Sequence, residues 1–130
     1  MEKRIPNVLV VDDDFMSCKI VTLMIKQSGY DVKFVESGKA ATEIMQKIRF
    51  DLVVLDWIMP APSGEHFITL VRSGAFGDHH RAIPIVVITA DLIRCTRKIC
   101  VQAGATDYLT KPTRLTDLVT VLQNCLNPPD

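Results

Sequence analysis

Five short apolar runs recur along the chain, each bounded by polar or turn residues: residues 8–11, 32–35, 52–55, 85–88 and the weaker 108–109. Between these runs, apolar residues recur at spacings of three and four, which is the pattern of an amphipathic helix. The chain is therefore predicted to alternate strands and helices in the order βαβαβαβαβα.

The Val/Ile/Leu runs are nearly continuous, which is typical of strands buried on both faces of a parallel sheet. Right-handed crossovers then give an α/β fold, a doubly wound five-stranded parallel sheet with helices on both faces. Gly29, Gly74 and Gly104 follow predicted helices, where a left-handed residue is common. Ser37 and Thr113 are predicted to cap the starts of the second and fifth helices.

The length of 130 residues predicts one domain, residues 1–130, with a core of about 7–126. Residues 127–130 form a tail or the start of a linker. The 15 basic and 15 acidic residues balance, which does not favour nucleic acid as a ligand of this domain. The lack of a long apolar run or an export signal predicts a cytoplasmic location away from the membrane.

The longest polar interruption runs from residue 74 to residue 84 and is predicted to be a loop, with His79 and His80 as a solvated pair. Four cysteines are scattered on or near helices without a metal-binding spacing, which predicts reduced thiols: Cys18, Cys95, Cys100 and Cys125.

The polar residues directly after the apolar runs are the candidates for chemistry, because ligands of open α/β sheets bind at the carboxyl ends of the strands. The first run ends in Asp12 and Asp13, the third in Asp56, the fourth in Thr89 and the fifth leads to Lys111. Each residue alone has an ordinary explanation as a helix cap, a turn residue or a solvated charge. Their occurrence together at one edge of one sheet indicates a site.

Acidic groups brought together repel one another unless a cation or a proton intervenes. Carboxylate oxygens suit Mg²⁺, which commonly shares its coordination with waters and a phosphate oxygen. Asp56 can act as a nucleophile toward a phosphoryl group, while Thr89 offers a hydroxyl and Lys111 an ammonium for its charge. The residues thus predict phosphoryl transfer assisted by a divalent ion.

Four motifs carry a close resemblance to the response-regulator receiver family: VLVVDDD, LVVLDWIMP, IVVITA and GATDYLTKP. The resemblance covers about residues 7–126. It implies a sheet in the flavodoxin-like strand order 2-1-3-4-5 and a role in two-component signalling.

The resemblance also implies a ligand set for Mg²⁺, with Mn²⁺ as a substitute. Asp13 would bind the metal directly, Asp12 largely through water, and Asp56 would be both ligand and phosphoacceptor. The backbone carbonyl of Ile58 would complete the protein ligands.

Other matched positions imply a switch. Lys111 would pair with the phosphoryl group, Thr89 would move to hydrogen-bond it, and Tyr108 would change rotamer as the following loop moves. Pro112 matches a position where the family often has a cis-proline. Gly64 matches a family glycine after the phosphoacceptor loop.

The implied partner is a histidine kinase or a histidine phosphotransfer protein carrying a phosphohistidine. A downstream effector would read the surface formed by the fourth helix, the fifth strand and the fifth helix, and dimerisation is left open. The domain would be a signalling switch that assists its own phosphorylation and dephosphorylation, rather than an enzyme.

Two departures from the family pattern leave the catalytic groups in place. The chain has Pro62-Ser63-Gly64 where the family often has Met-Asp-Gly, and Asp14 adds a third acid. Proline should stiffen that loop, which bears on partner docking more than on chemistry.

Two other interpretations stay open. Asp12-x-Asp14 after an apolar strand also fits a dehalogenase-type phosphatase with Asp12 as nucleophile, although no acidic pair follows a strand after Lys111. The chain could also be a receiver-like interaction module that is never phosphorylated, although it retains all five groups of the site.

Overall fold

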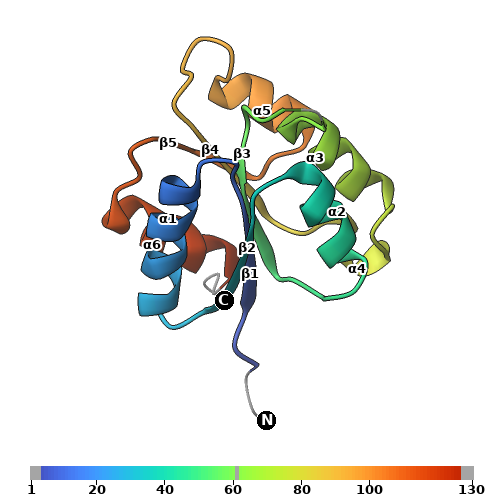
Figure 1. Cartoon of the computed structure of the whole chain (residues 1–130), viewed down its shortest axis with the longest axis horizontal. Coiled ribbons are helices and arrows are strands. Elements are labelled where there is room, and N and C mark those ends of the chain that lie inside the picture. The colour runs from blue at the N-terminus through green and yellow to red at the C-terminus, as the bar shows by residue number, and fades with distance from the viewer. Residues whose placement is uncertain (1–3, 61, 127–130) are drawn as a thin grey trace.

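The computed structural model of the chain describes residues 4–60 and 62–126 (Figure 1). Within these residues there are five strands: β1 (Asn7–Val11), β2 (Asp31–Val35), β3 (Leu52–Asp56), β4 (Ile85–Thr89) and β5 (Asp107–Thr110). The same ranges contain six helices: α1 (Phe15–Gln27), α2 (Gly38–Met45), α3 (Gly64–Ser73), α4 (Asp78–Arg81), α5 (Arg97–Ala103) and α6 (Leu115–Leu126). None of these helices is long and apolar enough to cross a membrane.

The five strands form one parallel sheet in the order β2-β1-β3-β4-β5. This confirms the predicted fold class and strand order. Helices α1 and α6 cover one face of the sheet, and α2, α3 and α5 cover the other (Figure 1). Because the strands are parallel, their carboxyl ends lie at the same edge, which is where the candidate residues follow them.

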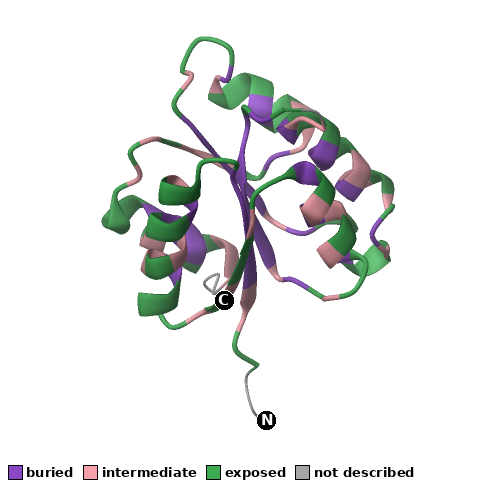
Figure 2. Cartoon of the chain, viewed as in Figure 1, coloured by how far each residue is buried: buried purple, intermediate pink, exposed green. Residues whose placement is uncertain are grey.

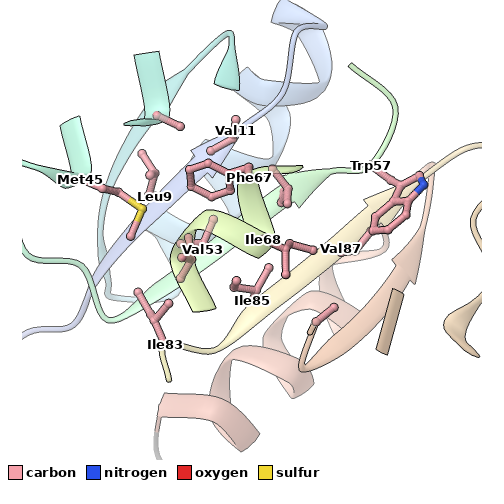
Figure 3. Close-up of a cluster of buried hydrophobic side chains, with 14 of the residues drawn as sticks. Leu9, Val11, Met45, Val53, Trp57, Phe67, Ile68, Ile83, Ile85 and Val87 are labelled. Atoms are coloured by element: carbon pink, nitrogen blue, oxygen red, sulfur yellow. The ribbon is translucent and has the colours of Figure 1, made fainter. Parts of the chain in front are cut away.

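Alternate residues of the central strands enter two separate cores. Leu9 packs with Met45 of α2 and Phe67 of α3 on one face (Figure 3). Val8 packs with Ile25 of α1 on the other. Burial on both faces explains the continuous apolar runs. Strands β3 and β4 are buried throughout and β1 is buried after Asn7, while β2 and β5 at the edges are partly exposed (Figure 2).

The helix ends follow the predicted turn chemistry in most places. Gly74 and Gly104 end α3 and α5 with φ of 88° and 118°, a left-handed conformation that favours glycine. Ser37 caps α2, because its hydroxyl accepts a hydrogen bond from the Ala40 N–H at 3.0 Å. These positions confirm the predicted helix boundaries.

The predicted cap at Thr113 is wrong. Helix α6 begins at Leu115, and its first backbone hydrogen bond runs from Leu118 N–H to the carbonyl of Arg114 at 3.0 Å. Arg114, not Thr113, therefore precedes the helix. A threonine close to the start of an amphipathic pattern does not fix the first turn to the exact residue.

The predicted solvated loop between residues 74 and 84 is also wrong in part. It contains the short helix α4, and His80 within that helix is fully buried. The His80 Nε2 accepts a hydrogen bond from Phe50 N–H at 3.0 Å, and Nδ1 lies 2.9 Å from the Phe76 carbonyl. Because both ring nitrogens have a backbone partner, the imidazole can be buried without a large penalty. Of the two neighbouring histidines, His79 is exposed as predicted and His80 is not.

All four cysteines are free thiols, as predicted. Cys18, Cys95 and Cys100 are buried, and Cys125 is partly exposed. Burial raises the thiol pKa of Cys18 to about 12, so this thiol is protonated at neutral pH.

Candidate functional site

Three carboxylates meet at the carboxyl edge of the sheet. Asp12 follows β1 directly and Asp56 is the last residue of β3, and the neighbouring pairing of these strands brings the two together. Asp12, Asp13 and Asp56 each offer a carboxylate oxygen, and the three oxygens lie within 4.8 Å of one another. Asp12 and Asp56 are buried, whereas Asp13 is exposed. The predicted acidic residues thus form a single group.

Asp14 does not join this group. Its carboxylate caps α1 by accepting hydrogen bonds from the N–H groups of Met16 at 3.1 Å and Ser17 at 3.4 Å. Its own N–H donates to the Asp12 carboxylate at 2.9 Å, which holds Asp12 in place. The third acid of the sequence motif therefore stabilises the helix and does not act as a partner of Asp12 in chemistry.

Lys111 brings a positive charge to the acidic group. Its Nζ lies 2.9 Å from the Asp12 carboxylate and 3.3 Å from that of Asp56. Burial alone would lower the pKa of this ammonium, but its hydrogen bond to Asp12 and the charge of Asp56 raise it overall. The peptide bond from Lys111 to Pro112 is cis. Lys111 thus remains charged and contacts both buried acids.

The site carries more negative charge than one lysine balances. The pKa of Asp56 is raised to about 6, first because burial disfavours the charged form and second because of the neighbouring Asp12. The charge of Lys111 opposes this effect without cancelling it. A divalent cation would relieve the repulsion, and three carboxylates with one exposed member suit a hard ion such as Mg²⁺ that keeps waters in its shell.

Thr89 ends β4 beside this group, and its hydroxyl is committed to the following loop. Strand pairing sets Asp56 opposite Ile88, so Thr89 is one residue further along the neighbouring strand. Thr89 is fully buried, and its Oγ1 accepts a hydrogen bond from the Asp91 N–H at 3.0 Å. It does not line the cleft that Asp56 and Lys111 share. The acids and the lysine thus lie together, whereas the Thr89 hydroxyl is bonded to the loop after β4 and does not face the cleft residues.

The cleft above Asp56 is open and has an apolar rim. Its lining consists of the buried acid, the lysine and residues of the two adjoining loops: Asp56, Ile58, Ala90, Asp91, Leu92, Ile93, Arg94 and Lys111. Ile93 is 88% exposed and Leu92 57%. Apolar side chains this exposed around a charged pocket are typical of a surface that docks another protein.

Tyr108 lies on β5 and contacts the segment that follows Thr89. Its hydroxyl donates to the Cys95 carbonyl at 2.9 Å, and the Arg97 guanidinium lies 5.7 Å from the centre of its ring. The tyrosine thus holds the end of the loop that Thr89 begins. The loop after β4 is therefore bonded at its start by Thr89 of β4 and at its end by Tyr108 of β5.

Gly64 is required by close packing under the phosphoacceptor candidate. A Cβ at this position would lie 2.8 Å from the Asp56 carbonyl oxygen and 3.0 Å from Trp57. Gly38 at the start of α2 is similarly tight, because a Cβ there would lie 2.7 Å from the Pro62 carbonyl oxygen. These two glycines let the starts of α2 and α3 lie close to the segment that follows Asp56. This close packing holds the end of β3 in position.

Sequence reasoning missed two parts of this region. It did not identify Leu92 and Ile93 as the rim, although two large apolar residues between Asp91 and Arg94 in a polar connection were a visible signal. It also did not connect Cys95 with the loop, because the contact uses a backbone carbonyl that any residue has.

Comparison with known proteins gives a consistent family match. The family model described as "Response regulator receiver domain" matches residues 8–123. The sensor protein GacS of Pseudomonas syringae pv. syringae is 34% identical over 112 residues, which cover 86% of this chain and 12% of that protein. The two-component response regulator ORR3 of Oryza sativa subsp. indica is 30% identical over 114 residues, which cover 87% of this chain and 85% of that protein. The chain therefore spans a small part of the sensor and most of the regulator.

Solved structures agree with this match. The chemotaxis response regulator CheY4 of Vibrio cholerae superposes with a TM-score of 0.84 at 29% identity, covering 95% of this chain and all of that one. The receiver domain of the sensor histidine kinase PA1611 of Pseudomonas aeruginosa PAO1 superposes with a TM-score of 0.84 at 27% identity, over 95% and 99% of the two chains. That structure is described as having a magnesium ion coordinated in the active site cleft.

Proposed function

The chain belongs to the response regulator receiver family, and on that premise we propose that Asp56 accepts a phosphoryl group from a phosphohistidine of a partner protein. The domain then acts as a signalling switch in a two-component system. Its relatives include both a sensor and a response regulator, so the partner is a histidine kinase or a histidine phosphotransfer protein.

The observation that carries this proposal is the group of three carboxylates with Lys111. A buried Asp56 beside Asp12, Asp13 and an ammonium at 3.3 Å provides a nucleophile and a balancing charge in one cleft. An aspartate with a purely structural role would have its charge stabilised by its partners, whereas burial and Asp12 raise the pKa of Asp56 despite its contact with Lys111, which is typical of a functional carboxylate.

The acidic residues fit Mg²⁺. We assign Asp12, Asp13 and Asp56, with the backbone carbonyl of Ile58, as the residues that would hold the ion. When bound, Mg²⁺ supplies positive charge that shields the carboxylate from the incoming anion. Its presence in the cleft of the PA1611 receiver domain supports this assignment.

In the transfer itself, a carboxylate oxygen of Asp56 attacks the phosphorus, and the bond between phosphorus and the imidazole nitrogen of the donor breaks. The phosphoryl group then adds negative charge in a cleft where Lys111 Nζ already lies within 3.3 Å. Lys111 can exchange its contact with Asp56 for one with the new oxygens. The ammonium thus stabilises the charge that develops.

The switch follows from the hydrogen bonds of the loop after β4. Thr89 moves its hydroxyl to a phosphoryl oxygen, and the Asp91 N–H then loses the acceptor it has at 3.0 Å. The loop shifts to satisfy that donor, and Tyr108, bonded to the Cys95 carbonyl, changes position with it. The change reaches the surface formed by α5, β5 and α6, where an effector binds.

Incubation with acetyl phosphate and Mg²⁺ tests the proposal. We expect the intact mass to increase by one phosphoryl group in the wild-type chain and in Asp78→Asn, whose side chain is exposed on α4. Asp56→Asn should show no increase. A mass increase that persists in Asp56→Asn would refute the assignment, and no uptake by the wild-type chain would favour a receiver-like interaction module.

A further inference from the structure

Cys95 and Cys100 form a buried pair of thiols beside the switch region. Both side chains are fully buried, and their Sγ atoms lie 2.8 Å apart. They come from either side of the start of α5, five positions apart in the chain. Neither thiol has a part in the phosphoryl transfer described above.

The position of the pair has a structural explanation. Thr96 caps α5, because its hydroxyl accepts a hydrogen bond from Ile99 N–H at 3.2 Å. Cys95 precedes the cap and Cys100 is the fourth residue of the helix, which are the two positions of a hydrophobic staple. A staple fixes the angle at which the chain enters a helix. Any two apolar side chains could serve, but two thiols can also become covalently joined.

Cys95 is linked to both residues of the proposed switch. Its N–H donates to the Asp91 carbonyl at 3.1 Å, and the Asp91 N–H donates to Thr89 at 3.0 Å. Its carbonyl accepts the hydrogen bond of Tyr108 at 2.9 Å. Anything that fixes Cys95 relative to α5 therefore fixes the loop on which Thr89 and Tyr108 act.

We propose that Cys95 and Cys100 are a redox modification site, at which a peroxide forms an intramolecular disulfide that locks the entry into α5. One thiol, as its thiolate, attacks the peroxide, the O–O bond breaks, and a sulfenic acid and water result. The second thiol then displaces a further water, and the Sγ–Sγ bond forms. The two thiols lose two electrons and two protons in all, and the peroxide is reduced to two waters.

Burial sets the rate of this reaction. Burial raises the pKa of both thiols, so few thiolates exist at neutral pH and oxidation of the folded chain is slow. Access comes through the loop that precedes Cys95, where Leu92 and Ile93 are exposed. Oxidation should therefore be faster at alkaline pH. Cys125, which is partly exposed, is the competing thiol to remove.

The effect on signalling rests on the proposed function. A disulfide ties Cys95 to the first turns of α5, so the loop can no longer shift when Thr89 leaves Asp91. The oxidised domain should take up phosphoryl groups severalfold more slowly than the reduced one, because the phosphorylated state needs that shift.

Peptide mapping of the Cys125→Ser chain tests the disulfide directly. The chain is treated with hydrogen peroxide and freed of oxidant. It is then unfolded in a denaturant that contains an alkylating reagent, which blocks the remaining free thiols, and digested with trypsin without reduction. Arg97 and Lys98 lie between the two cysteines, so trypsin separates them onto different peptides. We expect the two peptides to be joined, with two hydrogen atoms lost, and the joined pair to be absent from Cys95→Ala and Cys100→Ala.

Recovery of both cysteines on separate alkylated peptides after peroxide treatment would overturn the proposal, as would a disulfide to Cys18 in place of the expected pair. The acetyl phosphate assay then compares oxidised and reduced Cys125→Ser chains. Equal rates of uptake would overturn the regulatory part while leaving the mapped disulfide in place. Failure of the reduced chain to take up phosphoryl groups would instead count against the proposed function, since the mapping does not depend on Asp56.

Discussion

Asp51 and Asp56 lie at the two ends of the same strand, and their surroundings are opposite. Asp51 precedes β3 and accepts hydrogen bonds from the Arg4 guanidinium at 2.6 and 3.0 Å and from the Asn7 N–H at 2.8 Å. Burial alone would raise the pKa of Asp51, but its bonds to Arg4 and Asn7 lower that pKa overall. Asp56 ends β3 and its pKa is raised to about 6, because of burial and the nearby Asp12. One residue type therefore has two different roles at the two ends of one strand.

The same contrast extends to the two ends of the sheet. At the amino end, polar side chains satisfy backbone groups: His80 bonds Phe50 and Phe76, and Arg72 donates to the carbonyls of Gly104, Arg81 and Ile83. At the carboxyl end, three acids lie together, and one lysine contacts two of them, Asp12 and Asp56. Polar groups that are paired in this way stabilise the fold, whereas a sheet edge left with excess negative charge is suited to bind a cation and react.

The largest effect is expected from removing the satisfied histidine. His80→Ala leaves the Phe50 N–H buried without its acceptor and creates a cavity beneath α4. The free energy of unfolding should fall by about 3 kcal/mol, the sum of an unsatisfied donor and a core truncation. Urea denaturation followed by circular dichroism measures this.

His79→Ala is the matched control, since the neighbouring imidazole is exposed. It should change the free energy of unfolding by less than about 0.5 kcal/mol. If the two variants lose equal stability, the amino end does not depend on buried pairing and the contrast between the two ends fails.

The carboxyl and amino ends of the sheet also differ in how much of their structure the sequence predicts. The carboxyl edge was predictable because Asp12, Asp56 and Lys111 each follow an apolar run, and parallel strands bring such positions together. The buried His80 was not, since a histidine in a short polar segment gives no periodic signal and its burial depends on two distant backbone groups. Helix α4 was missed for the same reason, because four residues are too few to show a helical period.

Within this region, the sequence predicted that the acids and the lysine would lie together, but not the hydrogen bonds that Asp14 and Thr89 make. Asp14 adjoins Asp12 in sequence, but its carboxylate bonds the first turn of α1. Thr89 ends its strand as expected, but its hydroxyl is bonded to Asp91. Which partner a polar side chain selects depends on distances of a few tenths of an ångström, and these are set by the packing of loops that sequence periodicity does not describe.

Replacing each of the two aspartates by asparagine should change stability in opposite directions. Asp56→Asn removes a buried charge repelled by Asp12, so the free energy of unfolding should rise by about 1–2 kcal/mol in the presence of a chelator at neutral pH. Asp51→Asn weakens the bonds to Arg4 and Asn7, so the free energy of unfolding should fall, by a smaller amount. Urea denaturation of both variants beside the wild type measures the signs.

The double variant serves as the control, because the two sites lie at opposite ends of β3 and their effects should add. A loss of stability in Asp56→Asn would show that Asp56 is held by Lys111 as firmly as Asp51 is held by Arg4. The distinction between a paired and a repelled aspartate would then be wrong.

The smallest expected effect is a pH dependence at the amino end. Burial lowers the pKa of His80 below its usual value of 6.5, with a further lowering from His79 and Arg49, while the Phe76 carbonyl and Asp51 oppose it. The unfolded chain therefore binds a proton at His80 below about pH 6.5 that the folded chain does not bind. This contribution to stability is complete above pH 6.5 and is lost as the pH falls toward the folded pKa.

Asp56 acts in the opposite direction, because its raised pKa favours the folded state as the pH falls through about 6. The measurement therefore uses Asp56→Asn as the background, and compares it with Asp56→Asn/His80→Gln from about pH 8 to about pH 5. The variant that keeps His80 should lose more stability on acidification, since glutamine does not titrate. Parallel curves would mean that protonation of His80 is tolerated in the folded chain, and that its bond to Phe50 N–H does not hold the imidazole neutral.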